Sequence, residues 1–155
     1  QVVSVGRGNY DQRASIGLGL EVDEEYDYIF VGCGSGATLC GLVAAFPNSH
    51  IVGIAAFSGA EYLEEELRSF LCKEYSEKEP QNWTLDTEHH CGGFAKSSQE
   101  LSCLITSLEL ENDFELDAVY NGKVFLALQS WLQQGKLARG SKVLAIHTGG
   151  LQGKR

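Results

Sequence analysis

Apolar stretches of strand length alternate with stretches of helical spacing along most of the chain. Residues 28–33 and 51–57 are apolar runs without clean alternation, a pattern typical of strands that are covered on both faces. Residues 37–46 lie between them with helical spacing, and Pro47 with Asn48 ends that pattern. This part of the sequence therefore predicts a β-α-β unit.

The same alternation continues through the second half of the chain. Residues 60–72, 99–110 and the segment after Tyr120 have helical spacing, with Gly135 as the expected end of the last helix. The apolar side chains expected on the inner faces of the first and last of these helices are Leu63, Leu67, Phe70, Leu71, Val124, Phe125, Leu128, Trp131 and Leu132. Residues 2–5, 83–85 and 143–146 predict further short strands. We therefore expect one α/β domain over residues 1–155, with a mostly parallel sheet flanked by helices.

The composition is that of an ordinary folded protein, with 43% hydrophobic and 21% charged residues. The net charge of −9 argues against a broad nucleic-acid or anionic-membrane surface, because such surfaces collect Lys and Arg. No apolar run approaches the roughly 20 residues that span a bilayer, so we expect no membrane partner and a cytoplasmic location. The five cysteines form no C-x-x-C pair and are expected to be reduced thiols that mostly fill the core.

A glycine-rich turn follows the apolar run at 28–33 and precedes the helical segment at 37–46. Closely spaced glycines let backbone amides approach an anion at a helix N-terminus, where the free N–H groups and the helix dipole favour phosphate. Two hydroxyl side chains in the turn add further donors. The residues expected to form this cradle are Gly34, Ser35, Gly36, Ala37 and Thr38. The alternative reading is a tight turn that needs glycine only for its backbone angles.

The same turn also resembles the glycine loop of S-adenosylmethionine-dependent methyltransferases. A nucleoside site of that kind needs a carboxylate near the end of the second strand to bind the ribose hydroxyls. Residues 53–57 contain no acid, and Glu61 lies further on in the next helical segment. The turn also lacks the lysine of a nucleotide-triphosphate loop. A single phosphate monoester therefore fits the short cradle better than a nucleoside does.

Several separated segments together resemble one family. They are GSGAT at 34–38, NW at 82–83, GGFAK at 92–96, LDAVYNGK at 116–123 and IHTGGLQG at 146–153. In this order they are similar to the 1-aminocyclopropane-1-carboxylate (ACC) deaminase and D-cysteine desulfhydrase family. The resemblance covers roughly residues 28–153 and implies the C-terminal half of a pyridoxal-phosphate (PLP) enzyme. It also implies the tryptophan-synthase-β-like fold, fold type II, and a small amino acid as the substrate.

The resemblance assigns roles to individual residues of the chain. Residues 34–38 would hold the PLP phosphate, and Thr148 would offer its hydroxyl to the pyridine nitrogen. A neutral partner there keeps the ring nitrogen less protonated than a carboxylate would. Tyr120 would face the substrate as an acid, a base or an orienting hydroxyl, although a tyrosine that only anchors the start of a helix is the alternative.

Two departures from the family pattern bear on the reaction. ACC deaminases carry a glutamate after the tyrosine that corresponds to Tyr120, whereas this chain has Asn121, which is expected to line the substrate pocket. They also lack the threonine that corresponds to Thr148, so the desulfhydrase branch, with β-elimination to pyruvate, ammonia and sulfide, is favoured. Phe94 stands where the family usually has a second tyrosine, so a hydroxyl is lost from the expected substrate pocket.

The lysine that binds the cofactor in this family lies in a G-N-K-x-R-K segment, which does not occur here. The chain's own lysines are expected in polar or helical settings that do not match it. Because the sequence also has no methionine, we expect a partial or processed chain that is inactive alone and a homodimer when complete. A truncated or inactive form of the enzyme is the second hypothesis, and a methyltransferase-like nucleoside binder is the third.

Histidine and cysteine residues at 89–91, together with His50 or His147, invite comparison with a zinc site, since imidazole and thiolate are the usual zinc ligands. Adjacent side chains point in different directions, and no second ligand pair follows at finger spacing. We therefore expect no metal. His147, before the glycine pair at 149–150, is expected to hold the backbone in position rather than act as a general base.

Overall fold

The computed structural model describes residues 2–4, 22, 24–74 and 80–149 of the chain. In chain order the elements are β1 Val2–Ser4, β2 Tyr28–Cys33, α2 Ala37–Ala45, β3 His50–Ala55, α3 Glu61–Glu74, β4 Trp83–Asp86, α4 Gln99–Glu111, α5 Asn121–Gln133 and β5 Val143–His147. The strand expected at 28–33 has the predicted bounds, whereas the strand expected to end at Phe57 ends at Ala55.

The five strands form one sheet in the order β1-β5-β2-β3-β4, and each neighbouring pair is parallel. The register pairs Tyr28 with His50 and Val143, so β2, β3 and β5 begin at the same level. All carboxyl ends therefore lie at one edge of the sheet, which we call the carboxyl edge. The prediction of an α/β fold with a parallel sheet is confirmed.

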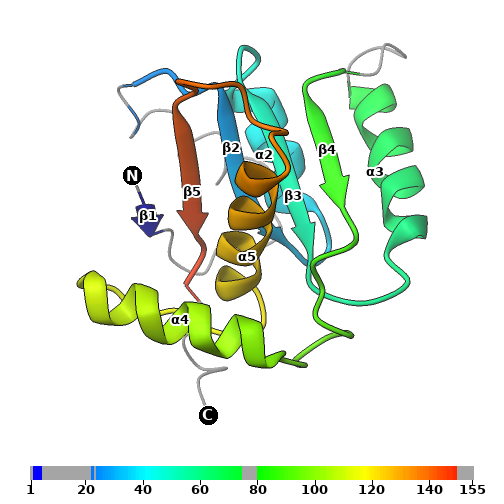
Figure 1. The fold of residues 1–155 in the computed structure, drawn as a ribbon. Helices are drawn as coiled ribbons and strands as arrows, with labels where there is room; N and C mark the ends of the chain where they lie inside the picture. The colour runs from blue at the N-terminus through cyan, green and yellow to red at the C-terminus, as the bar shows by residue number, and fades with distance from the viewer. Residues whose placement is uncertain (1, 5–21, 23, 75–79, 150–155) are drawn as a thin grey trace.

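Helices cover both faces of the sheet (Figure 1). On one face, side chains of α2 and α3 such as Leu39, Leu42 and Leu67 pack with Ile29 and Ile51 of the strands. On the other face, α5 packs its own apolar side chains against β2, β3 and β5. Helix α4 lies across the carboxyl edge beside the start of α5 (Figure 1). Strands buried on both faces explain the apolar runs without alternation.

Some expected core residues are not in the core. Phe70 is 39% exposed, because the buried stripe of α3 is formed by Leu63, Leu67 and Leu71, and a neighbouring position lies about 100° around the helix. Leu132 of α5 is 60% exposed, one position after the buried Trp131. The spacing rule therefore identified these helices correctly but assigned these two side chains to the wrong face.

The cysteines are more exposed than the sequence suggested. Cys33 and Cys40 are buried, but Cys72 and Cys91 are half-buried and Cys103 is exposed. The expectation that most cysteines fill the core is wrong, while all five have free thiols. Across the described ranges, no helix combines the length and the apolar character that a membrane crossing requires.

Candidate functional site

The carboxyl ends of β2 and β5 lie side by side. Val31 of β2 pairs with Ile146 of β5, so the segments that follow the two strands leave the sheet at the same edge. One of these segments is the glycine turn at 32–38, and the other contains Thr148. The structure therefore brings the two parts of the expected cofactor site to one edge of the sheet, although they are about 110 residues apart in the sequence.

The glycine turn leads into α2 with a glycine at the N-cap. Gly36 has φ 87°, in the left-handed region that favours glycine, and a Cβ atom there would lie 2.2 Å from Leu67 Cδ2. No side chain caps α2, and its first turn contains no acidic residue. Its first backbone amides are therefore not occupied by a side-chain cap, as an anion site at a helix N-terminus requires.

Two hydroxyl groups of the turn are available beside these amides. Ser35 is exposed and Thr38 is half-buried in the first turn of α2, after Ala37. Neither hydroxyl makes a hydrogen bond to another residue in the part of the chain that the structure describes. The turn can therefore add hydroxyl donors to its backbone amides, which suits a phosphate group.

Tyr120 lies against the same turn. A Cβ atom on Gly32 would lie 3.1 Å from Tyr120 Cβ, and one on Gly34 would lie 3.3 Å from the tyrosine hydroxyl oxygen. Phe94 packs edge-on against the Tyr120 ring, with the ring centroids 6.1 Å apart. The predicted substrate residues Tyr120 and Phe94 are therefore in contact with each other and next to the predicted phosphate cradle.

Asp117 fixes the start of α5 and was not identified from the sequence. Its carboxylate is buried and accepts hydrogen bonds from the backbone N–H groups of Val119, Tyr120 and Asn121, at 2.9, 2.7 and 3.2 Å. The side-chain amide of Asn121 also donates to it. A signal was present in the sequence, because an aspartate just before a helix often accepts its first N–H groups.

Asn121 connects the start of α5 to the end of β5. Its Nδ2 donates to the Gly149 carbonyl at 2.7 Å, and its Oδ1 accepts the Thr148 N–H at 3.1 Å. The Asn121 side chain is therefore buried and bonded to protein groups, and its predicted contact with the substrate stays a prediction. The Thr148 hydroxyl makes no hydrogen bond to another residue within residues 22, 24–74 and 80–149.

His147 holds the backbone, as the sequence suggested. The Gly149 N–H donates to His147 Nδ1 at 3.1 Å, so the proton is on Nε2, which donates to the Glu115 carbonyl at 2.8 Å. Both ring nitrogens are therefore engaged with main-chain groups. The imidazole ring therefore ties the end of β5 to the segment before α5.

The burial of Lys123 was not indicated by the sequence. As expected for the lysines, it lies in a helical setting, but its side chain is fully buried in the first turn of α5. Its ammonium group donates to the backbone carbonyls of Ala56 and Gly93, each at 2.9 Å. No local signal marks it, because both carbonyls come from distant segments of the chain.

Comparisons with known proteins show what the chain is similar to. No family model matches the chain. A Pyrococcus abyssi protein named "Putative 1-aminocyclopropane-1-carboxylate deaminase" is 33% identical over 147 residues, and its Pyrococcus horikoshii counterpart is 32% identical over 143. A crystal structure of an ACC deaminase homologue superposes with a TM-score of 0.78 at 29% identity and covers 94% of this chain. The chain is a partial-length homologue of the ACC deaminase family.

The relationship to the ACC deaminase family covers most of this chain but less than half of its relatives. The chain spans 42% and 43% of the two Pyrococcus proteins and 46% of the crystallised homologue. The processed form of threonine deaminase isoform 2 from Solanum lycopersicum superposes with a TM-score of 0.59 at 14% identity, which supports the fold alone. The predicted fold type is thus confirmed by two structures of related architecture.

His89, one of the residues compared with a zinc site, makes hydrogen bonds within the chain. His89 Nδ1 lies 2.8 Å from Asp86 Oδ1, and Trp131 Nε1 donates to the other carboxylate oxygen at 2.8 Å. In the ranges that the structure describes, no three His, Cys, Asp or Glu side chains are grouped as metal ligands. Asp86 instead joins β4 to the loop that follows it and to α5.

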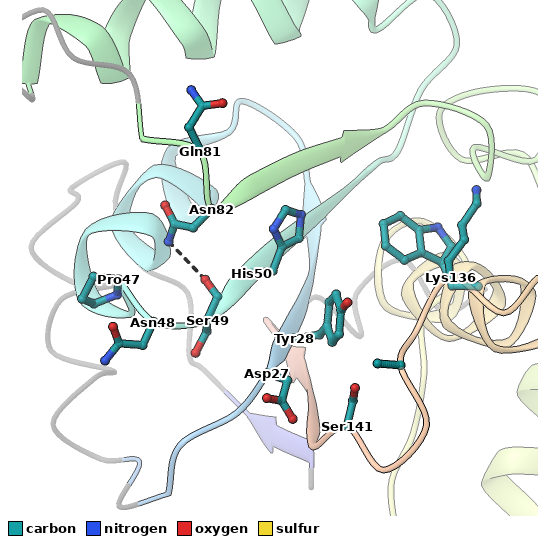
Figure 2. A pocket seen from close by; sticks show the side chains of 12 residues that line it. Asp27, Tyr28, Pro47, Asn48, Ser49, His50, Gln81, Asn82, Lys136 and Ser141 are labelled. Carbon is teal, nitrogen blue, oxygen red and sulfur yellow. Dashed lines mark hydrogen bonds between the residues drawn. The ribbon is translucent and has the colours of Figure 1, made fainter.

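A cleft of about 830 Å³ lies at the opposite, amino edge of the sheet. Figure 2 shows its lining side chains, among them Tyr28, His50 and Asn82, with Asn82 donating to the Ser49 carbonyl. His50 is bonded to Thr84, and burial lowers its pKa. None of the residues predicted for the family's site lines this cleft. The family resemblance therefore points to the carboxyl edge and not to this hollow.

Proposed function

We propose that this chain is the phosphate-binding and ring-binding segment of a PLP-dependent lyase that acts on a small amino acid. β-Elimination from D-cysteine, giving pyruvate, ammonia and sulfide, is the favoured reaction. One observation carries the proposal: the adjacent residues Tyr120 and Asn121 contact the glycine turn and the backbone of Thr148 respectively. A ligand with a phosphate at one end and a ring nitrogen at the other suits that arrangement.

The residues present fit such a cofactor. Gly36 has φ 87°, which L side chains rarely adopt, and in this turn amides 34–38 would bind the phosphate. When bound, PLP supplies an electron sink for the carbanion formed at the substrate. The Thr148 hydroxyl, placed by Asn121, would bind the ring nitrogen without charging it.

Tyr120 is the residue proposed to handle a proton of the substrate. Its ring lies between the glycine turn and Phe94, and Asp117 fixes its backbone. Its phenolic hydroxyl can both donate and accept a hydrogen bond. It would donate to the departing sulfur or orient the substrate from that side.

The lysine that attaches the cofactor has no counterpart in the G-N-K-x-R-K pattern here, and the chain spans less than half of its relatives. We therefore propose that turnover requires the remaining part of the enzyme, acting as a homodimer. An inactive form is the second candidate, and the loss of a hydroxyl at Phe94 favours it.

Cofactor binding tests the site directly. Equilibrium dialysis of the chain with PLP should show binding that Ser35→Asp weakens at least tenfold, because a carboxylate in the turn repels the phosphate. Ser107→Asp places the same charge on an exposed position of α4 and should leave the affinity unchanged. Equal affinities of the Ser35 variant and the parent chain for PLP would show that residues 34–38 do not bind the phosphate. Heat released on titration with S-adenosylmethionine would instead support the nucleoside-binding hypothesis.

The reaction is tested in the enzyme that contains the missing lysine segment. Release of sulfide and pyruvate from D-cysteine would support the lyase, and Tyr120→Phe should lower turnover at least tenfold with PLP binding retained. Release of 2-oxobutanoate from ACC without sulfide from D-cysteine would assign the deaminase reaction. No product from either substrate, with PLP bound, would favour the inactive form.

A further inference from the structure

Lys123 ties three separate parts of the chain together at the carboxyl edge. It lies in the first turn of α5, and its two hydrogen bonds go to Ala56, directly after β3, and to Gly93, in the segment 91–96 between β4 and α4. Both distances from Nζ are 2.9 Å. These partners are 67 and 30 residues away in the sequence, so the contact fixes tertiary structure rather than the helix itself.

The Lys123 ammonium group is costly to bury at this position. Among the described residues it makes no ion pair, and burial lowers its pKa while Cys91 and Asp117 nearby raise it. Burying an ion costs its hydration, and an apolar side chain of similar length can fill the same space without that cost. The need to fill space therefore does not explain a lysine at position 123. Its N–H groups, which donate to two backbone carbonyls, do explain it.

The segment that Lys123 contacts has an unusual backbone. Cys91 and Ala95 both have φ 55°, and Gly92 and Gly93 have φ 88° and 137°. A non-glycine residue in the left-handed region is strained, because its Cβ atom lies too close to the backbone. Two local hydrogen bonds form turns here: the Gly93 N–H donates to His90 O at 3.1 Å, and the Lys96 N–H donates to Gly93 O at 3.2 Å. Contacts from outside the segment must stabilise this conformation. The hydrogen bond from Lys123 to the Gly93 carbonyl is one such contact.

Phe94 occupies the middle of this segment and is 59% exposed. Its ring nevertheless stands edge-on to Tyr120. An aromatic side chain so exposed gains little from burial, so its place depends on the backbone that carries it. The position of the Phe94 ring beside Tyr120 is therefore tied to the conformation of Gly93.

We propose that Lys123 is a positioning residue, which holds the segment 91–96 through Gly93 so that Phe94 stands against Tyr120 and forms one wall of the substrate site. It is not the lysine that attaches a cofactor, because two carbonyls engage its ammonium group. The claim that this wall faces a substrate rests on the proposed function. The claim that Lys123 holds the segment 91–96 is independent of the proposed function.

Amide hydrogen exchange with Lys123→Met tests the inference without any cofactor. Methionine keeps the apolar length but removes the donors. We expect the amides of Gly93 and Lys96 to exchange at least tenfold faster, while the amides of β2 and β3 keep their rates. The nuclear Overhauser contacts between the Phe94 and Tyr120 rings should weaken. Lys142→Met, at an exposed lysine whose ion pair with Glu24 has an N–O distance of 3.9 Å, should change none of these.

Unchanged exchange at Gly93 and Lys96 with intact ring contacts would overturn the inference, as would equal acceleration throughout the sheet. If Lys123→Met fails to fold, the parent chain decides the matter: with ¹⁵N-lysine, a slowly exchanging ammonium signal should show contacts to the Gly93 α-protons. Absence of that signal would also overturn the inference. Failure of PLP to bind, with these results as expected, would remove the proposed function and leave the role of Lys123 intact.

Discussion

The Tyr120 hydroxyl lies so close to Gly34 that a Cβ atom on the glycine would be 3.3 Å from the phenolic oxygen. This distance is tighter than most contacts of a real Cβ atom, so a side chain at Gly34 requires a shift of a few tenths of an ångström. The tyrosine and the turn therefore constrain each other, and Gly34 is needed for its small size.

Gly34→Ala should weaken PLP binding by about threefold to tenfold, or roughly 0.6–1.4 kcal/mol, because the turn or the ring must move. Equilibrium dialysis measures this change. Combining Gly34→Ala with Tyr120→Phe removes the oxygen that the new methyl group meets, so the double variant should recover most of the affinity. If the double variant binds as weakly as Gly34→Ala alone, contact with the hydroxyl is not the cause.

Asn121→Ala should lower the free energy of unfolding by about 1–3 kcal/mol. The substitution leaves the Thr148 N–H and the Gly149 carbonyl without the partners that they have in the folded chain. Urea unfolding followed by circular dichroism measures the loss. Asn112→Ala is the matched control, because that exposed amide, at the C-cap of α4, donates to Leu108 O four residues earlier. Similar losses in both variants would contradict a special role for Asn121.

Stability should depend on Asp86 at low pH. Burial acts to raise the pKa of Asp86, but hydrogen bonds from His89 and Trp131 outweigh it and lower the pKa from 3.8 to about 2. Because the folded pKa lies below the unfolded one, the stabilisation is present above about pH 4 and is lost as the pH falls towards 2. The contribution is on the order of 2 kcal/mol.

Urea unfolding of the parent chain and of Asp86→Asn between pH 2 and pH 7 measures this contribution. Asp86→Asn should be less stable at neutral pH and should lose less stability between pH 4 and pH 2. Asp113→Asn, at an exposed position, is the control and should follow the parent curve. Parallel curves for the parent and Asp86→Asn would show that Asp86 does not carry the acid dependence.

Phe94→Tyr should change the reaction more than the fold. The ring stands against Tyr120 and is largely exposed, so an added hydroxyl reaches the proposed substrate space without entering the core. In the complete enzyme we expect at least a threefold change in kcat/KM for D-cysteine, with unchanged thermal stability. Phe70→Tyr adds the same group to a half-exposed ring on α3 and should leave kcat/KM unaltered. Identical kinetics for Phe94→Tyr would exclude this residue from the substrate wall.

The local sequence pattern determined the helices and strands of this protein, because the residues that predict each of them lie close together in the sequence. The run at 28–33 contains aromatic and β-branched side chains and ends in glycines, and it is β2 with the predicted bounds. The short motifs around Thr38, Tyr120 and Thr148 could likewise be identified from the sequence alone, together with their order along the chain. Their resemblance to one family is matched by relatives at 33% and 32% identity.

Tertiary structure alone decided which of these residues meet and which are buried. Nothing local indicates that Lys123 would be fully buried, since its two carbonyl partners lie 67 and 30 residues away. The register of β2 with β5 brings the glycine turn to the same edge as Thr148, and that register follows from the packing of both sheet faces. Helical spacing placed Phe70 inside because it cannot resolve neighbouring positions at the margin of a buried stripe. The sequence specifies the chemical groups, whereas long-range packing fixes the distances between them.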